Sequence, residues 1–258
     1  MISVNNVCKS YGTKPVLKNV SVDFPESRVT SLIGPNGAGK STLLMSIGRL
    51  LDIEQGEILL RNTSIRDISL KNYAKRVATM RQFHNLNLRL TVRELVAFGR
   101  FPYSQGALTK DDHRIIDEAL SFLVLQPLGN TFIDELSGGQ RQMAFLAMSI
   151  AQQTDYLLLD EPLNNLDMKH AVSIMRALRH LCDEHKRTVI LVVHDINFAA
   201  NYSDNIIAMK QGAIHSSGSV EDVVTADTLQ DLYELNFEIL KTSQGVVCNY
   251  FNQLGKPK

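Results

Sequence analysis

The sequence predicts an α/β protein with a mixed sheet, an antiparallel β part at its N-terminus and an inserted α-helical subdomain. A short apolar strand at 29–33 runs into a glycine-rich loop that is followed by a helical pattern. Strand and helix patterns alternate again from 156 to 209, which favours a parallel arrangement in the main sheet. Between these parts, residues 83–153 have a mostly helical pattern.

The first third of the chain is predicted to be largely β structure. Val20, Val22 and Phe24 alternate with polar residues, as in a half-buried antiparallel strand. A helix is expected from Lys40 to Leu51, directly after the glycine-rich loop. Two further strands are expected at 57–60 and 77–81, the second ending just before Gln82.

Three helix starts are expected in the middle of the chain. Two of them, at Thr91 and Ser137, have the spacing of a capping box, in which a side chain three positions after the capping residue can bond back to it. Thr91 with Glu94 opens the first, and Thr109 with Asp112 opens a longer one. Ser137 with Gln140 opens the third. These starts predict three separate helices within the inserted segment.

The last third returns to strands at 156–160, 188–193 and 206–209, with a helix expected over 168–184. A mixed tail with a turn at Gln244–Gly245 follows. We therefore expect a core subdomain of residues 1–82 and 154–219 and a helical subdomain of residues 83–153. The tail, residues 220–258, is expected to pack on the core.

Composition excludes several classes of protein. The 258 residues carry no net formal charge, which gives no electrostatic support for binding nucleic acid. No apolar run approaches the roughly 20 residues that a membrane-spanning helix needs, and no signal peptide is visible. Three scattered cysteines, Cys8, Cys182 and Cys248, suit free thiols in a reducing compartment. We expect a soluble cytosolic protein.

The glycine-rich loop matches the P-loop pattern GxxxxGK[ST], and its strand–loop–helix context argues against a chance glycine-rich turn. Backbone N–H groups of such a loop surround phosphates, its lysine reaches the β and γ oxygens, and its serine binds Mg²⁺. The sequence therefore predicts a site for a nucleoside triphosphate and Mg²⁺. Its residues are Gly34, Pro35, Asn36, Gly37, Ala38, Gly39, Lys40, Ser41 and Thr42.

Two acids end the apolar strand that begins at Tyr156. Asp160 is predicted to lie on the magnesium side of a nucleotide site, and Glu161 to polarise the attacking water as a general base. The alternative is a pair of acids that are merely solvated at a strand end, which is common where no P-loop is present.

A second helix start suited to an anion is formed by the Ser137 motif, which comprises Leu136, Ser137, Gly138, Gly139 and Gln140. Its serine can cap the helix, and its two glycines leave the backbone N–H groups accessible. One chain with two anion-binding helix starts implies a nucleotide that is held from two sides.

Taken in this order, these motifs resemble those of the ATP-binding-cassette (ABC) ATPases over nearly the whole chain. The resemblance implies that Gln82 contacts Mg²⁺ and water, and that Asp160 holds the metal through water. It also implies that Asp167 belongs to a loop crossing a dimer interface, and that His194 contacts the γ-phosphate. Tyr11 resembles the aromatic residue that stacks on adenine. Alone, the glutamine could be a solvated residue, the histidine a structural group and the tyrosine a packing residue.

The resemblance also implies the partners. Two copies of the chain would form a homodimer in which each ATP lies between one copy's P-loop and the other copy's Ser137 motif. Because the chain has no visible membrane spans, transport requires two integral-membrane permease subunits, served indirectly by an extracytoplasmic substrate-binding protein. The chain would then lie at the cytoplasmic face of the inner membrane, held there by the permease, and no nucleic-acid partner is expected.

Within this family, the runs 96–102, 136–143 and 161–167 look most like those of ATPases that power iron–siderophore import. Haem and cobalamin importers are close alternatives, and Tyr103 departs from the histidine of many relatives. An efflux ATPase is a further alternative, because other subunits choose the cargo. Ribosome- or chromosome-associated ATPases are disfavoured, since the chain has neither a second cassette nor a long coiled coil.

Overall fold

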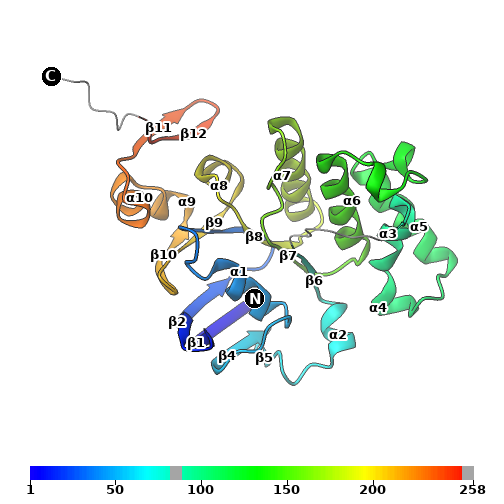
Figure 1. Cartoon of the computed structure of the whole chain (residues 1–258), viewed down its shortest axis with the longest axis horizontal. Helices are drawn as coiled ribbons and strands as arrows, with labels where there is room; N and C mark the ends of the chain where they lie inside the picture. The colour runs from blue at the N-terminus through cyan, green and yellow to red at the C-terminus, as the bar shows by residue number, and fades with distance from the viewer. Residues whose placement is uncertain (82–88, 252–258) are drawn as a thin grey trace. The chain divides into compact units, whose positions relative to one another are not determined.

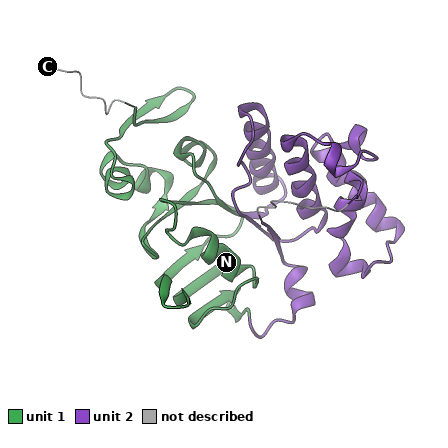
Figure 2. Ribbon diagram, in the orientation of Figure 1, with its two compact units in different colours: residues 1–65, 190–258 green, residues 66–189 purple. Residues whose placement is uncertain are grey.

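The structure is a computed structural model that describes residues 1–81 and 89–251. It divides into two compact units (Figure 2). Unit 1 contains Met1–Ile65 and the chain from Ile190 onward, and unit 2 contains Arg66–Val189.

An antiparallel sheet forms the N-terminal part of unit 1, with strand order β2-β1-β4-β5 (Figure 1). Val4 of β1 lies opposite Val22 of β2 on one side and Ile58 of β4 on the other. The predicted antiparallel β part is therefore confirmed. Its strands are β1 (Ile2–Tyr11), β2 (Lys14–Phe24), β4 (Gln55–Leu60) and β5 (Thr63–Ser64).

Unit 1 also holds part of the main sheet, and this part is mixed. The fully buried β3 (Val29–Ile33) is parallel to β9 (Asn205–Lys210), with Leu32 opposite Ile207. The next strand, β10 (Ala213–Ser219), is antiparallel to β9. Two helices accompany these strands, α1 (Lys40–Ile47) and α8 (Ile196–Tyr202). The predicted mixed α/β sheet is confirmed.

The tail of unit 1 forms two helices and a β-hairpin. The turn predicted at Gln244–Gly245 connects the two strands of this hairpin. Leu229, Leu232 and Cys248 of the tail belong to one buried cluster with Ile33 of β3 and Ala199 of α8. The core of unit 1 thus extends into the tail. The tail elements are α9 (Val220–Val223), α10 (Ala226–Tyr233), β11 (Glu238–Thr242) and β12 (Gly245–Asn249).

Unit 2 combines a pair of parallel strands with the inserted helices. β6 (Val77–Met80) pairs with β7 (Tyr156–Leu159), whose four residues are all buried. β8 (Thr188–Val192) contributes residues to both units. The helices of unit 2 are α2 (Leu70–Ala74), α3 (Val92–Phe98), α4 (Phe101–Ser104), α5 (Lys110–Phe122), α6 (Gly138–Ala151) and α7 (Met168–Asp183), with short 3₁₀ turns at Gln126–Leu128 and Ile133–Glu135.

Side-chain capping explains most of the helix starts. Both predicted capping boxes are present, at the starts of α3 and α6, and the structure adds a third at the start of α5. A helix was predicted from Lys40 to Leu51, and its predicted C-terminal boundary is wrong because α1 ends at Ile47. Gly48 caps it, and glycine disfavours continuation of a helix. Within the described ranges, no helix is both long and apolar enough to span a bilayer.

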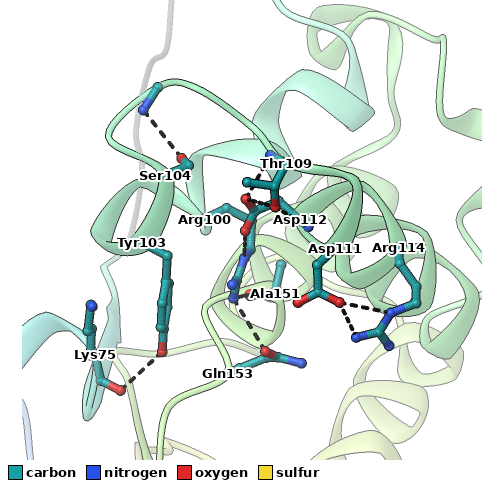
Figure 3. A network of polar contacts seen from close by, with 11 residues as sticks. Lys75, Arg100, Tyr103, Ser104, Thr109, Asp111, Asp112, Arg114, Ala151 and Gln153 are labelled. Atoms are coloured by element: carbon teal, nitrogen blue, oxygen red, sulfur yellow. Dashed lines mark hydrogen bonds and ion pairs between the residues drawn. The ribbon is translucent and has the colours of Figure 1, made fainter.

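A buried polar network holds the helices of unit 2 together around Arg100 (Figure 3). Its guanidinium Nε donates to Asp112 Oδ1 of α5 at 2.8 Å, and both side chains are almost completely buried. Arg100 Nη1 also donates to the carbonyl oxygen of Ala151 at 2.8 Å, at the C-terminus of α6. The network therefore ties the start of α5 to the end of the helix that begins at the Ser137 motif.

Aromatic and capping contacts complete this network. The Tyr103 ring lies 4.1 Å from the Arg100 guanidinium, and the Tyr103 hydroxyl donates to the carbonyl of Lys75 at 3.4 Å. Asp112 Oδ2 accepts from the backbone N–H of Thr109 at 3.0 Å and from its hydroxyl. The hydrogen bond from the Thr109 backbone, followed by that from Arg100, lowers the pKa of Asp112 to about 2. Asp112 is therefore ionised at neutral pH.

Candidate functional site

The P-loop connects β3 to α1 in unit 1, as the sequence predicts. Gly34 has a φ of +137°, and a Cβ there would lie 2.1 Å from the carbonyl oxygen of Met209. Gly39 has a φ of +100°, and a Cβ there would lie 2.8 Å from the carbonyl oxygen of Val16. Both positions require glycine because of conformation and of close backbone approach.

Lys40 lies inside this loop rather than in solvent. Its side chain is buried, and its ammonium donates to the carbonyl oxygens of Gly34 at 2.7 Å and Pro35 at 3.0 Å. A buried ammonium beside the first turn of a helix concentrates positive charge at one point. α1 has no side-chain cap and no acidic residue in its first turn, so its first N–H groups are suited to an anion.

Two other predicted residues of unit 1 are accessible. Tyr11 ends β1 and is 51% exposed, which leaves a ring face accessible for stacking on a base. His194 is exposed and lies between β8 and α8. The Val193 N–H donates to the carbonyl oxygen of Leu32 at 3.2 Å, which brings this segment beside the end of β3. His194 and the P-loop thus follow neighbouring segments of unit 1.

The two predicted acids lie at the end of β7 in unit 2. Asp160 is 8% exposed, and its N–H donates to the carbonyl oxygen of Met80 at 2.9 Å. Glu161 has a φ of +51°, a left-handed conformation that costs energy for a residue with a Cβ. Asn164 donates from its side-chain amide to Glu161 Oε2. The glutamate side chain is therefore oriented by a neighbour that the sequence did not single out.

The Ser137 motif forms the capped start of α6, also in unit 2. Ser137 Oγ accepts from the Gln140 N–H at 3.3 Å, and Gln140 Oε1 accepts from the Ser137 N–H at 3.0 Å. Ser137 and Gly138 are exposed, whereas Leu136 is buried as the anchor of the motif. Gln142 of α6 donates to the carbonyl oxygen of Pro162 at 3.0 Å, which links the helix to the loop after Glu161.

A histidine that the sequence did not indicate joins the Ser137 motif to Asp167. Asp167 caps α7 and accepts from the backbone N–H of His170 at 2.8 Å, and its Oδ1 lies 2.8 Å from His170 Nδ1. The backbone bond, followed by the ring bond, lowers the pKa of Asp167. A Cβ at Gly139 would lie 2.7 Å from the His170 ring. The only signal in the sequence was the spacing of an N-cap aspartate and a residue three positions later.

The predicted site residues thus fall into two groups. Unit 1 carries Tyr11, the P-loop and His194, and unit 2 carries Asp160, Glu161, the Ser137 motif and Asp167. Gln82, predicted to contact Mg²⁺, lies outside the described residues.

Two of the predicted metal ligands lie in different units, and each carries an oxygen donor, the ligand type that Mg²⁺ prefers. Ser41 supplies a hydroxyl in the first turn of α1, and Asp160 supplies a carboxylate. Among the described residues, no group of three or more acidic, histidine or cysteine side chains could form a cage for a metal. Each of these two residues, taken by itself, offers an oxygen ligand of the kind that Mg²⁺ prefers.

Comparison with known proteins gives the same family as the motifs. The model of the family described as ABC transporter matches residues 17–164. The petrobactin import ATP-binding protein FatE of Bacillus anthracis is 49% identical over 97% of this chain and 100% of its own length. The iron(3+)-hydroxamate import ATP-binding protein FhuC of Bacillus subtilis is 37% identical, over 96% of this chain and 94% of its own length.

A solved structure supports the same assignment. The dimeric, post-hydrolysis state of the ATP-binding cassette MJ0796 bound to ADP and Pi aligns with a TM-score of 0.76 and 32% identity. The alignment covers 85% of this chain and 99% of that one. This chain belongs to the ABC transporter family, as an ATP-binding protein of the branch that serves iron–siderophore import.

Proposed function

We propose that this chain, the ATP-hydrolysing subunit of an iron–siderophore importer, works as a homodimer that closes on ATP. Each nucleotide would lie between the P-loop of one copy and the Ser137 motif of the other. The observation that carries this proposal is the charge pattern at the helix starts. Among helices of eight or more described residues, only α1 and α6 have neither an acidic N-cap nor an acid in the first turn.

That pattern matters because an acidic side chain at a helix start already satisfies the positive end of the helix dipole. α5 and α10 carry such acids in their first turn, and Asp167 caps α7. α1 and α6 have none, so both can accept the negative charge of a ligand. One nucleotide contacted by both helix starts would be stabilised from two sides.

The roles of the remaining side chains follow from their chemistry. Lys40 would bind the β- and γ-phosphates, while Ser41, Asp160 and Gln82 would hold Mg²⁺, which would neutralise phosphate charge. Glu161, oriented by Asn164, would accept the proton of the attacking water. His194 would donate to the γ-phosphate, and Tyr11 would stack on the base.

The cargo is proposed from the relatives and not from any pocket of this chain. FatE and FhuC are described as import ATP-binding proteins for petrobactin and for iron(3+)-hydroxamate, and both align along nearly all of this chain. A ferric siderophore is therefore the cargo that we propose, with haem or cobalamin as the alternative. The chain would act at the cytoplasmic face of the membrane through two permease subunits and an extracytoplasmic binding protein.

An exposed apolar surface in unit 2 suits contact with a permease. Phe98 and Phe101 are 53% and 58% exposed and line one hollow together with Ala97 and Leu108. They flank Arg100, whose hydrogen bond to Ala151 reaches α6. This surface belongs to the helical subdomain that we propose for residues 83–153. The other parts of the proposed division are a core subdomain of residues 1–82 and 154–219 and a tail of residues 220–258.

Replacing Ser137 with arginine tests the two-chain site. We expect S137R to abolish ATP-dependent dimerisation, because the bulky cation removes the cap and occupies the anion-facing helix start. ATP binding to the single chain should stay within about twofold, since the P-loop is intact. Sedimentation with and without ATP measures dimerisation, and titration with a fluorescent nucleotide measures the affinity of the single chain for ATP.

S219R is the matched control for S137R, because Ser219 is also the N-cap of a capping box, at α9. Both substitutions remove a cap that is worth about 1 kcal/mol, but only S137R should affect dimerisation. An ATP-dependent dimer formed normally by S137R would contradict the proposal.

Replacing Ser41 with alanine tests the metal assignment. We expect S41A to raise the Mg²⁺ concentration for half-maximal hydrolysis by at least about tenfold, because one oxygen ligand is lost. S46A is the control: Ser46 lies one turn further along α1 and bonds the Thr42 carbonyl. Phosphate release measured across a Mg²⁺ titration gives the Mg²⁺ concentration for half-maximal hydrolysis in each variant. An unchanged midpoint in S41A would remove Ser41 from the metal site.

A further inference from the structure

The tail of the chain contacts the P-loop directly, through a residue that no motif indicated. Tyr233, the last residue of α10, accepts a hydrogen bond on its hydroxyl from the Gly34 N–H at 3.1 Å. Both residues belong to unit 1. Burial raises the pKa of Tyr233 to about 12, so its hydroxyl is neutral at physiological pH. The contact therefore adds no charge to the loop.

Gly34 is fixed at both of its backbone polar groups. Its N–H donates to Tyr233, and its carbonyl oxygen accepts from the Lys40 ammonium at 2.7 Å. A glycine with φ +137° has little intrinsic preference for one conformation, so its external partners decide its geometry. The hydroxyl of Tyr233 thus acts on the residue whose carbonyl holds Lys40.

Tyr233 is itself held by the rest of the tail. Its ring lies 5.9 Å from that of Phe237, which lies 5.4 Å from that of Tyr250. Aromatic pairs at these distances pack favourably. Tyr250 directly follows β12, so the hairpin and α10 share one aromatic cluster.

The hairpin is anchored in turn on α8, the helix that follows His194. Asn201 accepts from the Val246 N–H at 2.9 Å and donates to the Val246 carbonyl oxygen at 2.7 Å. Asn197 Oδ1 accepts from the Cys248 N–H at 2.8 Å. These amide side chains bond β12 as a neighbouring strand would. The anchor fixes the position from which Tyr233 reaches the loop.

We propose that Tyr233 is a positioning residue of the nucleotide site. Its hydroxyl holds Gly34 so that the Gly34 carbonyl keeps the Lys40 ammonium inside the loop, where phosphate oxygens bind. A charged donor that is already fixed before the ligand binds strengthens binding, because less conformational entropy is lost on association. The inference rests on the proposed role of Lys40 in binding phosphates.

Replacing Tyr233 with phenylalanine keeps the ring and removes the hydroxyl. We expect Y233F to weaken ATP binding about three- to tenfold, the effect of one lost hydrogen bond. The KM for ATP should rise by a similar factor, and kcat at saturating ATP should change less than about twofold. Nucleotide titration and steady-state kinetics measure these values, and thermal unfolding reports any loss of stability.

Y250F is the matched control, because it removes a hydroxyl from the same aromatic cluster without touching the Gly34 contact. The decisive comparison repeats Y233F in a K40A background. If Tyr233 acts through Lys40, the two losses of affinity are not additive, and Y233F has little further effect on K40A.

The possible outcomes distinguish a failure of the positioning role of Tyr233 from a failure of the proposed function. A normal ATP affinity in Y233F, or an unchanged penalty in the K40A background, overturns the positioning role while the P-loop assignment stands. An unaltered affinity in K40A overturns the P-loop assignment itself. A fall in melting temperature with unchanged ATP affinity shows a purely structural tyrosine.

Discussion

Glu161→Gln is expected to lower ATP hydrolysis by about 10²- to 10⁴-fold, which is the usual contribution of a positioned general base. Glutamine has nearly the same shape but cannot accept the proton of the attacking water. Asn164 can still hydrogen-bond the side-chain oxygen of glutamine, so the loop should keep its conformation. ATP binding should be retained, and the dimer should accumulate because it cannot reopen by hydrolysis.

Phosphate release and sedimentation in the presence of ATP measure the two effects of E161Q. E184Q is the control, since Glu184 is an exposed residue at the end of α7. Turnover at the wild-type rate in E161Q would show that Glu161 is not the base. Loss of ATP binding would show instead that the substitution disrupts the site.

Arg100→Ala is expected to destabilise the protein by about 3–5 kcal/mol, because it leaves the Asp112 carboxylate buried without its cation. The Ala151 carbonyl at the end of α6 would lose its charged donor in the same step. For a chain of this length, the melting temperature should fall by roughly 10 °C. Thermal and urea unfolding measure the loss.

Arg114→Ala is the matched control for Arg100→Ala. Figure 3 shows Arg114 on α5, near Arg100. Arg114 pairs with Asp111 and Glu118 on the exposed face of α5, where solvent screening leaves ion pairs with little effect on stability. Equal losses for R100A and R114A would contradict the special role of burial. The folded pKa of Asp112 lies below its unfolded value, so its contribution is present above about pH 4. That contribution is lost as the pH falls through about 2.

Local patterns in the sequence were sufficient for the fold class and for the local elements that carry the candidate site residues. The capping boxes of α3 and α6 depend on residues three positions apart, so they are visible in the sequence. The P-loop and the strand before Asp160 are local for the same reason. The end of α1 was predicted four residues too late, because apolar Leu50 and Leu51 continue the pattern past Gly48.

Contacts between distant parts of the chain could not be predicted. Tyr233 meets Gly34 across 199 positions, and Arg100 meets Ala151 across 51. No periodicity encodes such pairs, since they depend on how the elements pack. The left-handed conformation of Glu161 was also missed, because non-glycine residues adopt it rarely and only when their surroundings impose it.

In the dimer that we propose, each ATP is held by the P-loop of one chain and the Ser137 motif of another. Mixing two defective chains tests it most directly, with K40A in one and S137R in the other, both in the E161Q background. Neither chain alone should form an ATP-dependent dimer. The mixture has one intact composite site, so we expect a dimer that retains one ATP. A mixture that stays monomeric, while E161Q alone dimerises with ATP, would contradict the account.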